Sequence, residues 1–182
     1  NIPIIDEFNL TKVKSGIGVI HRVSYYGNEI YDHLLTRREI VKRLLNNYFP
    51  YHNALKLLIK NAKKINNRVL VLDFHSMPSR FLDNSVDIVI GNNFNLSCNE
   101  TISTKIINYF YDYNYSLSIN DPYSGGFITK FYGKPMDRIN ILQIEINRSL
   151  YMNEDTLEIK SNKLNVLSKN LNSIIKKLTN DI

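Results

Sequence analysis

Three stretches of the chain carry apolar residues at helical spacing. The first follows Thr36-Arg-Arg-Glu39, which has the form of a capping box, and its apolar stripe runs to about Ile65. Pro50 lies inside this stretch. Because proline lacks a backbone N–H and clashes with the preceding turn, we expect it to kink or split the helix. The other stretches are residues 101–113 and the segment from about Ser161 onward, whose lysine-bearing face should lie in solvent.

Short apolar runs separate these helices. We expect strands at residues 68–72, 87–90, 115–119, 127–131 and 139–146. The first two runs are almost continuously apolar, which is typical of strands buried on both faces. Strands that alternate with helices of this length predict an α/β fold built on a layered sheet.

Composition supports a folded protein and narrows its class. Hydrophobic residues make up 43% of the 182 residues, enough for a sizeable core, and the 22% of charged residues argues against wholesale disorder. No apolar run approaches the roughly 18 residues of a membrane span, so we expect no membrane role. Cys98 is the single cysteine, which excludes an internal disulfide framework and fits a reducing cytoplasm.

The net charge of +6 raises the question of nucleic-acid binding. A nucleic-acid footprint needs clustered basic residues and a recognisable module. The lysines here are instead scattered among asparagines, mostly on the predicted helix surfaces. We therefore expect no nucleic-acid partner, and a basic binding protein stays as an alternative.

Asp73-Phe-His75-Ser76 follows the predicted strand at residues 68–72, and we expect His75 at the carboxyl end of a central strand. Ligand chemistry in α/β sheets gathers at the carboxyl ends of strands, and an imidazole there can bind zinc while a carboxylate orients its other nitrogen. The alternative is a loop histidine that bonds only to its neighbours, because a metal site needs three or four ligands.

Gln143-Ile-Glu145 lies in the strongly apolar strand predicted at residues 139–146. The two-residue alternation of a strand places Gln143 and Glu145 on one face. A buried glutamate costs several kcal/mol unless it is paired, so Glu145 needs either a role or a partner. One role is a general base beside a metal-bound water, and we then expect Glu145 to approach His75 from another strand of the same sheet. The alternative is a structural ion pair with Arg148.

The segment Asn120-Asp-Pro-Tyr-Ser-Gly125-Gly126 is rich in turn-forming residues. Paired glycines allow a backbone to approach a ligand and to aim N–H groups at an anion or a carbonyl oxygen. The alternative is a simple connection between two strands. His21 and His52 are weaker candidates, and each alone favours a structural role.

Together these segments resemble the N-formylglutamate amidohydrolase family. The resemblance runs from about residue 16 to 155 and rests on a collinear order of motifs. These are Gly16-x-Gly18-Val-Ile-x-Arg22, Gly27-x-x-Ile-Tyr31, Arg43 with Tyr48-x-Pro50-Tyr51-His52-x-x-Leu55, Asp73-x-His75-Ser76, Asp87 with Gly91 and Ser97-Cys98, Gly125-Gly126-x-Ile128-Thr129, Gly133-x-Pro135, and Gln143-x-Glu145 with Tyr151-Met152. It implies a single domain over residues 1–182 with a three-layer α/β/α fold and a mixed central sheet, similar to aspartoacylases and zinc carboxypeptidases.

The resemblance also implies an activity and a set of site residues. The activity is hydrolysis of the formyl or other small acyl amide of an acidic amino acid, a small-molecule substrate, with a divalent metal that is expected to be zinc. His75 is then a metal ligand and Glu145 the general base. Contacts to the substrate carboxylates and the oxyanion are expected from Arg22, Asn120, Gly125, Gly126 and Arg148.

The chain departs from the family pattern before Gly16. It lacks the Pro-His-Ser-Gly-like segment that supplies an early metal ligand, and it lacks an Asp-x-Asn-Arg motif. We therefore expect an N-terminally incomplete domain that pairs with a missing segment, binds zinc weakly and shows at most trace activity alone. A non-catalytic remnant of a truncated or split gene is the second alternative.

Overall fold

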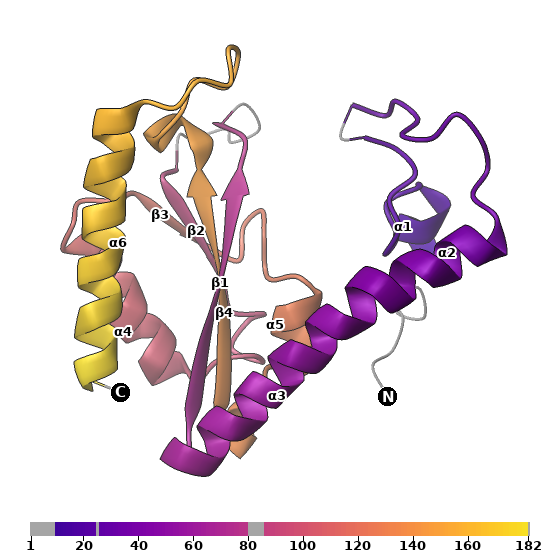
Figure 1. Cartoon of the computed structure of the whole chain (residues 1–182). Helices are drawn as coiled ribbons and strands as arrows, with labels where there is room; N and C mark the ends of the chain where they lie inside the picture. The colour runs from indigo at the N-terminus through magenta and orange to yellow at the C-terminus, as the bar shows by residue number, and fades with distance from the viewer. Residues whose placement is uncertain (1–9, 25, 80–85, 182) are drawn as a thin grey trace. The chain divides into compact units, whose positions relative to one another are not determined.

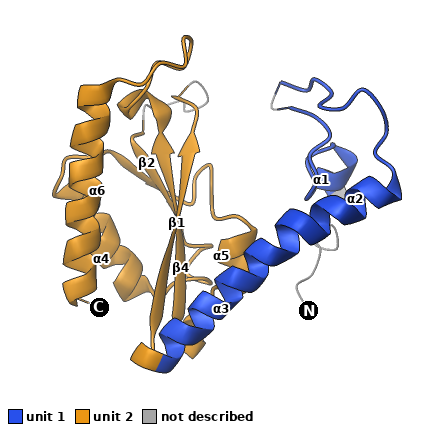
Figure 2. Ribbon diagram, viewed as in Figure 1, with its two compact units in different colours: residues 1–64 blue, residues 65–182 orange. Residues whose placement is uncertain are grey.

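The computed structural model describes residues 10–24, 26–79 and 86–181 of the chain. The chain forms two compact units, Asn1–Lys64 and Ile65–Ile182, which are distinguished by colour in Figure 2 and are described separately below. The single domain expected from the sequence stays a prediction. Within the described ranges, no helix is both long enough and apolar enough to cross a membrane.

The first unit is helical. It contains α1 (Leu10–Lys14), α2 (Arg37–Arg43), the π-helical segment η2 (Leu44–Tyr48) and most of α3 (Phe49–Asn66). The capping box is confirmed, because the Thr36 hydroxyl accepts a hydrogen bond from the Glu39 backbone N–H and the Glu39 side chain accepts one from the Thr36 N–H. The helix is not split at Pro50: α2, η2 and α3 follow one another without a break. The proline is accommodated by the π-helical turn directly before it, in which the Phe49 N–H bonds back to the Leu44 carbonyl.

The second unit is built on a four-stranded mixed sheet (Figure 1). Its strands are β1 (Val69–Met77), β2 (Ile88–Gly91), β3 (Leu117–Ile119) and β4 (Ile139–Asn147), in the spatial order β1-β4-β2-β3. β4 runs parallel to β1 and antiparallel to β2, and β2 runs parallel to β3. The mixed sheet predicted by the family resemblance is therefore confirmed.

Helices lie on both faces of this sheet. α4 (Glu100–Tyr111) and α6 (Ser161–Asp181) cover one face, as Figure 1 shows. Leu142 and Ile144 of β4 point to this side and form a fully buried core with Ile106 and Phe110 of α4 and Ile174 of α6. The opposite face of β4 carries Gln143 and Glu145 and is met by the N-terminal end of α5 (Phe127–Tyr132). Two short 3-10 helices, η4 (Pro135–Asp137) and η5 (Arg148–Leu150), flank β4.

The predicted strand at residues 127–131 is wrong, because this segment forms α5. Gly126 provides an extended N-cap, and the rings of Phe127 and Phe131 stack at 5.0 Å, one helical turn apart. A five-residue apolar run has too few positions to distinguish a strand from a helix by periodicity. The helical form of this segment buries Thr129 and Tyr132.

β1 also differs from expectation. It continues to Met77, so Asp73 and His75 lie inside the strand and not in a loop after it. Parallel pairing with β4 extends to Met77 opposite Asn147 and keeps these polar residues in the strand conformation. In the described part of the chain, β1 is an edge strand and β4 lies inside the sheet, which corrects the expectation that His75 belongs to a central strand.

Candidate functional site on the face of strands β1 and β4

Four polar side chains share one face of the parallel pair β1 and β4. The pairing places Asp73 opposite Gln143 and His75 opposite Glu145. Alternate residues of a strand point to the same side, so all four side chains emerge opposite the α4–α6 core. The sequence expectation that Glu145 approaches His75 from another strand of the same sheet is met, while the role of each residue stays a prediction.

His75 lies between two carboxylates. Its Nε2 is 3.1 Å from Asp73 Oδ2, and its Nδ1 is 3.8 Å from Glu145 Oε1. The hydrogen bond with Asp73 raises the pKa of His75 above its usual value, and the charges of both carboxylates act in the same direction, against partial burial. The imidazole therefore holds a proton more readily than a free histidine while remaining accessible to a substrate, since its side chain is 44% exposed.

Glu145 is almost entirely buried. Its Oε1 accepts a hydrogen bond of 2.7 Å from Gln143 Nε2. Burial raises the pKa of Glu145 above its usual range, while His75, the Gln143 hydrogen bond and the charge of Arg148 lower it in part. A carboxylate in this environment accepts a proton more readily than one in water, as a general base must.

Glu145 and Arg148, both described residues, do not form the direct ion pair that was the alternative role for Glu145. The Arg148 guanidinium donates its hydrogen bond from Nε to Ser76 Oγ at 3.2 Å, at the end of β1. Its charge still lowers the pKa of Glu145. Arg148 therefore lies close enough to act on the site electrostatically, with a guanidinium group that a substrate carboxylate could bind.

The glycine-rich segment and Asn120 are bonded to the protein itself. The Gly126 N–H donates to Gln143 Oε1 at 2.5 Å, so this amide is directed at the sheet and not at an open site. Asn120 and Asn92 form a reciprocal pair, in which Asn120 Oδ1 accepts from the Asn92 N–H and Asn120 Nδ2 donates to Asn92 Oδ1. The substrate contacts expected from Asn120, Gly125 and Gly126 stay predictions.

Gly91 is one of the residues that carry the family resemblance, but the sequence did not predict its structural role. This glycine ends β2 opposite Gln143, and a Cβ atom at this position would lie 2.7 Å from the Gly125 backbone nitrogen. Only glycine therefore lets the loop approach the sheet this closely. A glycine after an apolar strand was the available signal, but it also marks an ordinary strand end.

Arg22 belongs to the first unit. Its Nη2 donates to the Val13 carbonyl at 3.0 Å, and it lines a hollow of about 390 Å³ together with Lys14 and His33. His52, also in the first unit, is buried, and burial lowers its pKa. The substrate contact expected from Arg22 stays a prediction.

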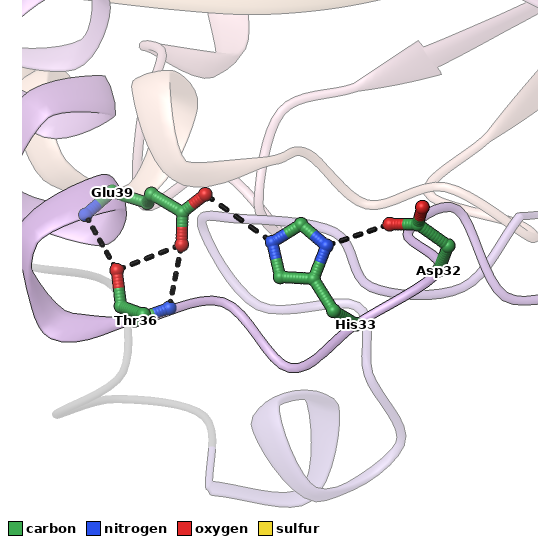
Figure 3. Close-up of polar contacts among 4 residues, drawn as sticks. All are labelled: Asp32, His33, Thr36 and Glu39. Carbon is green, nitrogen blue, oxygen red and sulfur yellow. Dashed lines mark hydrogen bonds and ion pairs between the residues drawn. The ribbon is translucent and has the colours of Figure 1, made fainter.

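A second histidine lies between carboxylates in the first unit, at the start of α2 (Figure 3). His33 Nδ1 is 2.6 Å from Asp32 Oδ1, and its Nε2 is 3.2 Å from Glu39 Oε1. The Thr36 hydrogen bonds lower the pKa of Glu39 to about 2, and the bond with Asp32 raises the pKa of His33. All these groups are exposed, and Glu39 completes the capping box of α2. We therefore assign the cluster to the N-terminal cap of this helix.

The described residues do not supply a complete metal site. Among residues 10–24, 26–79 and 86–181, no group of three His, Cys, Asp or Glu side chains is arranged to hold a metal ion. His75 Nε2 is already bonded to Asp73, and its Nδ1 faces Glu145. These donors alone therefore do not fit a catalytic zinc centre with three protein ligands.

The pairing of His75 with Asp73 gives a direct prediction. Replacing Asp73 by asparagine should lower the pKa of His75, because it removes the charge and weakens the acceptor that favour the protonated ring. Titration of the histidine ring protons by NMR measures this shift. His33, whose acceptors are Asp32 and Glu39, is an internal control that should titrate as before. An unchanged His75 titration would show that the pair does not form in solution.

Comparison with known proteins gives consistent results. A family model described as N-formylglutamate amidohydrolase matches residues 4–152. An N-formylglutamate deformylase of Pseudomonas putida is 29% identical over 110 residues, which are 58% of this chain and 41% of that protein. Another, from Pseudomonas aeruginosa, is 26% identical over 121 residues, which are 64% and 46% of the two chains. The chain thus spans less than half the length of these two relatives.

Solved structures agree with the family match. The crystal structure of an N-formylglutamate amidohydrolase from Ralstonia eutropha JMP134 superposes with a TM-score of 0.84 at 28% identity, covering 93% of this chain and 63% of the other. A gene product of Agrobacterium tumefaciens, with a TM-score of 0.65 and 18% identity over 88% of this chain, shares the fold. Since the family model matches residues 4–152, well over half of its length, the chain belongs to the N-formylglutamate amidohydrolase family.

Proposed function

We propose that this chain takes part in hydrolysis of the formyl amide of an N-formylated acidic amino acid, N-formyl-L-glutamate, with Glu145 as general base. The observation that carries the proposal is the buried Glu145 carboxylate, held by Gln143 on the same face of the sheet as the partly exposed His75. The named activity of the two deformylase relatives supports the choice of substrate.

In the proposed reaction, Glu145 takes a proton from water and later gives it to the leaving amine. A water oxygen attacks the formyl carbon, and the water proton passes to the Glu145 carboxylate. When the carbon–nitrogen bond breaks, the same proton passes to the departing amine and Glu145 is ionised again. The formic acid that is released ionises to formate, and its proton passes to the free amine of glutamate or to solvent water. Burial of Glu145 favours the first transfer because it raises the affinity of the carboxylate for the proton.

A divalent metal, with zinc favoured by the imidazole ligand, stays part of the proposal. His75 would be one ligand, and when bound the metal would polarise the formyl oxygen and the attacking water. Because the described residues do not complete such a site, the proton transfers above are assigned to Glu145 alone.

We propose Arg148 as the group that binds a substrate carboxylate, with Arg22, Asn120 and Gly125 as further contacts. The Gly126 N–H, also expected at the substrate from the sequence, is bonded to Gln143 Oε1 and is not assigned to it. Replacing Arg148 by glutamine should raise KM for N-formyl-L-glutamate about tenfold or more, since a hydrogen bond between charged groups contributes about 1.5–3 kcal/mol. Steady-state kinetics measures the change. Arg138→Gln, an exposed arginine at the other end of β4, is the matched control and should leave KM unchanged. Equal KM values for the wild type and Arg148→Gln would exclude this contact.

Substrate choice tests the proposed function itself. Formate release from N-formyl-L-glutamate should exceed that from N-formyl-L-alanine, which has the same scissile bond and lacks the side-chain carboxylate. Release of formate from both substrates at the same rate would leave an amidohydrolase without the proposed preference. Release from neither, by folded protein, would contradict the activity.

A further inference from the structure

We infer that Gln143 is a positioning residue, anchored by the backbone N–H of Gly126, that fixes which oxygen of Glu145 receives the proton. The inference rests on the proposed function and deepens it. In the sequence, Gln143 lies two residues before Glu145 on the same face of the predicted strand. In the structure it links the glycine-rich loop to that carboxylate through two hydrogen bonds.

The direction of the two bonds follows from their chemistry. The Gly126 N–H can only donate, so it must meet the carbonyl oxygen of the Gln143 amide, at 2.5 Å. The NH₂ end of the same amide then points to Glu145 and donates to Oε1 at 2.7 Å. Reversing the amide would place two donors against each other at Gly126 and two acceptors at an ionised Glu145.

This arrangement distinguishes the two oxygens of Glu145. Oε1 receives the Gln143 hydrogen bond, which occupies one of its lone pairs and lowers its basicity. Oε2 receives no hydrogen bond from Gln143, so it is the more basic oxygen and takes the proton from water. In the described part of the chain, Gln143 is the hydrogen-bond donor to this carboxylate, since His75 Nδ1 lies at 3.8 Å, beyond hydrogen-bond range. Without Gln143, the carboxylate would lose the bond that selects its orientation.

The loop that anchors Gln143 is itself held by small residues. Gly125 has φ +120°, a conformation that side chains strongly disfavour. Gly91 lies opposite Gln143 in β2, and a Cβ there would come within 2.9 Å of the Tyr123 carbonyl oxygen as well as the Gly125 nitrogen. The close approach needed by the Gly126–Gln143 bond therefore depends on glycine at both positions.

Burial makes this link strong. Gln143 is 5% exposed and Glu145 6% exposed, so water competes weakly for either hydrogen bond. A buried amide that lost its partners would carry the cost of unsatisfied polar groups. The bonds therefore hold the carboxylate in place before the substrate binds, which is the preorganisation that efficient catalysis requires.

Two variants of Gln143 separate positioning from packing. Gln143→Met keeps the volume but removes both hydrogen bonds, and Gln143→Glu keeps the acceptor for Gly126 while its donor returns only when the new acid is protonated. Asn140→Asp is the matched control: it makes the same change of amide to acid at a buried position of β4 on the opposite face, where Asn140 Oδ1 still accepts from the Asn99 N–H.

The expected result is a kcat effect with little change in KM. In the full chain, Gln143→Met should lower kcat for N-formyl-L-glutamate about tenfold or more and change KM less than about threefold. At pH 8, Gln143→Glu should lower kcat as much as Gln143→Met does. As the pH falls, its kcat should recover relative to that of the wild type, because the introduced glutamate becomes protonated and can donate to Glu145. The kcat of Asn140→Asp should stay within about twofold of the wild-type kcat, both at pH 8 and at lower pH.

Amide hydrogen exchange at Gly126 provides a readout independent of turnover. Its exchange should be slow in the wild type and in Gln143→Glu, and at least about tenfold faster in Gln143→Met. Unchanged kcat in folded Gln143→Met, or a loss matched by Asn140→Asp, would overturn the inference. Absence of turnover in the wild type would refute the proposed function alone; equal Gly126 exchange in the wild type and Gln143→Met would then refute the inference separately.

Discussion

Replacing Glu145 by glutamine is expected to lower kcat for N-formyl-L-glutamate hydrolysis by about 10²- to 10⁴-fold, the range that a general base contributes. The substitution keeps the shape of the side chain and a carbonyl oxygen that can accept the Gln143 hydrogen bond. It removes only the ability to take the proton from water. Single-turnover measurement of formate at high protein concentration gives the rate constant even where turnover is slow.

The pH dependence of the wild type supplies a second readout for Glu145. Because burial raises its pKa, the ionised base is lost as the pH falls through a value above the usual glutamate range. The acid limb of the rate profile should therefore lie higher than for an exposed glutamate. Glu158→Gln, an exposed residue of the second unit, is the matched control and should retain the wild-type rate. A Glu145→Gln variant with the wild-type rate would exclude Glu145 as the base.

The largest expected effect on stability comes from Phe110. Its ring is fully buried in the core between α4 and the sheet and makes an edge contact with Tyr115. Phe110→Ala is expected to lower the free energy of unfolding by about 3–5 kcal/mol, because it removes buried apolar surface and leaves a cavity. Urea denaturation followed by circular dichroism measures the loss.

Tyr111, the next residue of α4, is the matched control. Its side chain is 52% exposed, so Tyr111→Ala removes an aromatic ring from the same helix with little loss of burial. The change in the free energy of unfolding should stay within about 0.5 kcal/mol. Similar losses for the two variants would contradict the placement of the core on the inner side of α4.

Much of the second unit could be predicted from local patterns. The strand at residues 139–146 and the helix from Ser161 have long, regular apolar periodicity, and both occur as β4 and α6. Their signals are strong because burial is distributed over many residues. Residues 127–131 offered only one short apolar run, and their helical form depends on Gly126 and on packing that the sequence does not display.

The facing pair His75 and Glu145 could be anticipated, because strand alternation and sheet pairing are regular. The hydrogen bonds around that pair could not. The Gly126–Gln143 bond joins residues 17 positions apart, and the Asn92–Asn120 pair joins residues 28 positions apart. Such contacts depend on loop paths that hydrophobic patterning does not specify. For the same reason the sequence assigned the glycine loop to the substrate, whereas Gly126 bonds to the sheet.

Conversion of N-formyl-L-glutamate carrying ¹³C in its formyl group tests the central claim most directly. The purified chain is incubated with this substrate at high protein concentration, because only slow turnover is expected of the chain alone. Formate and glutamate are quantified by NMR beside the Glu145→Gln variant. We predict formate and glutamate in equal amounts, formed faster than in buffer and faster than with the variant. Folded wild-type protein that forms no more formate than buffer, or no more than the variant, would contradict the account.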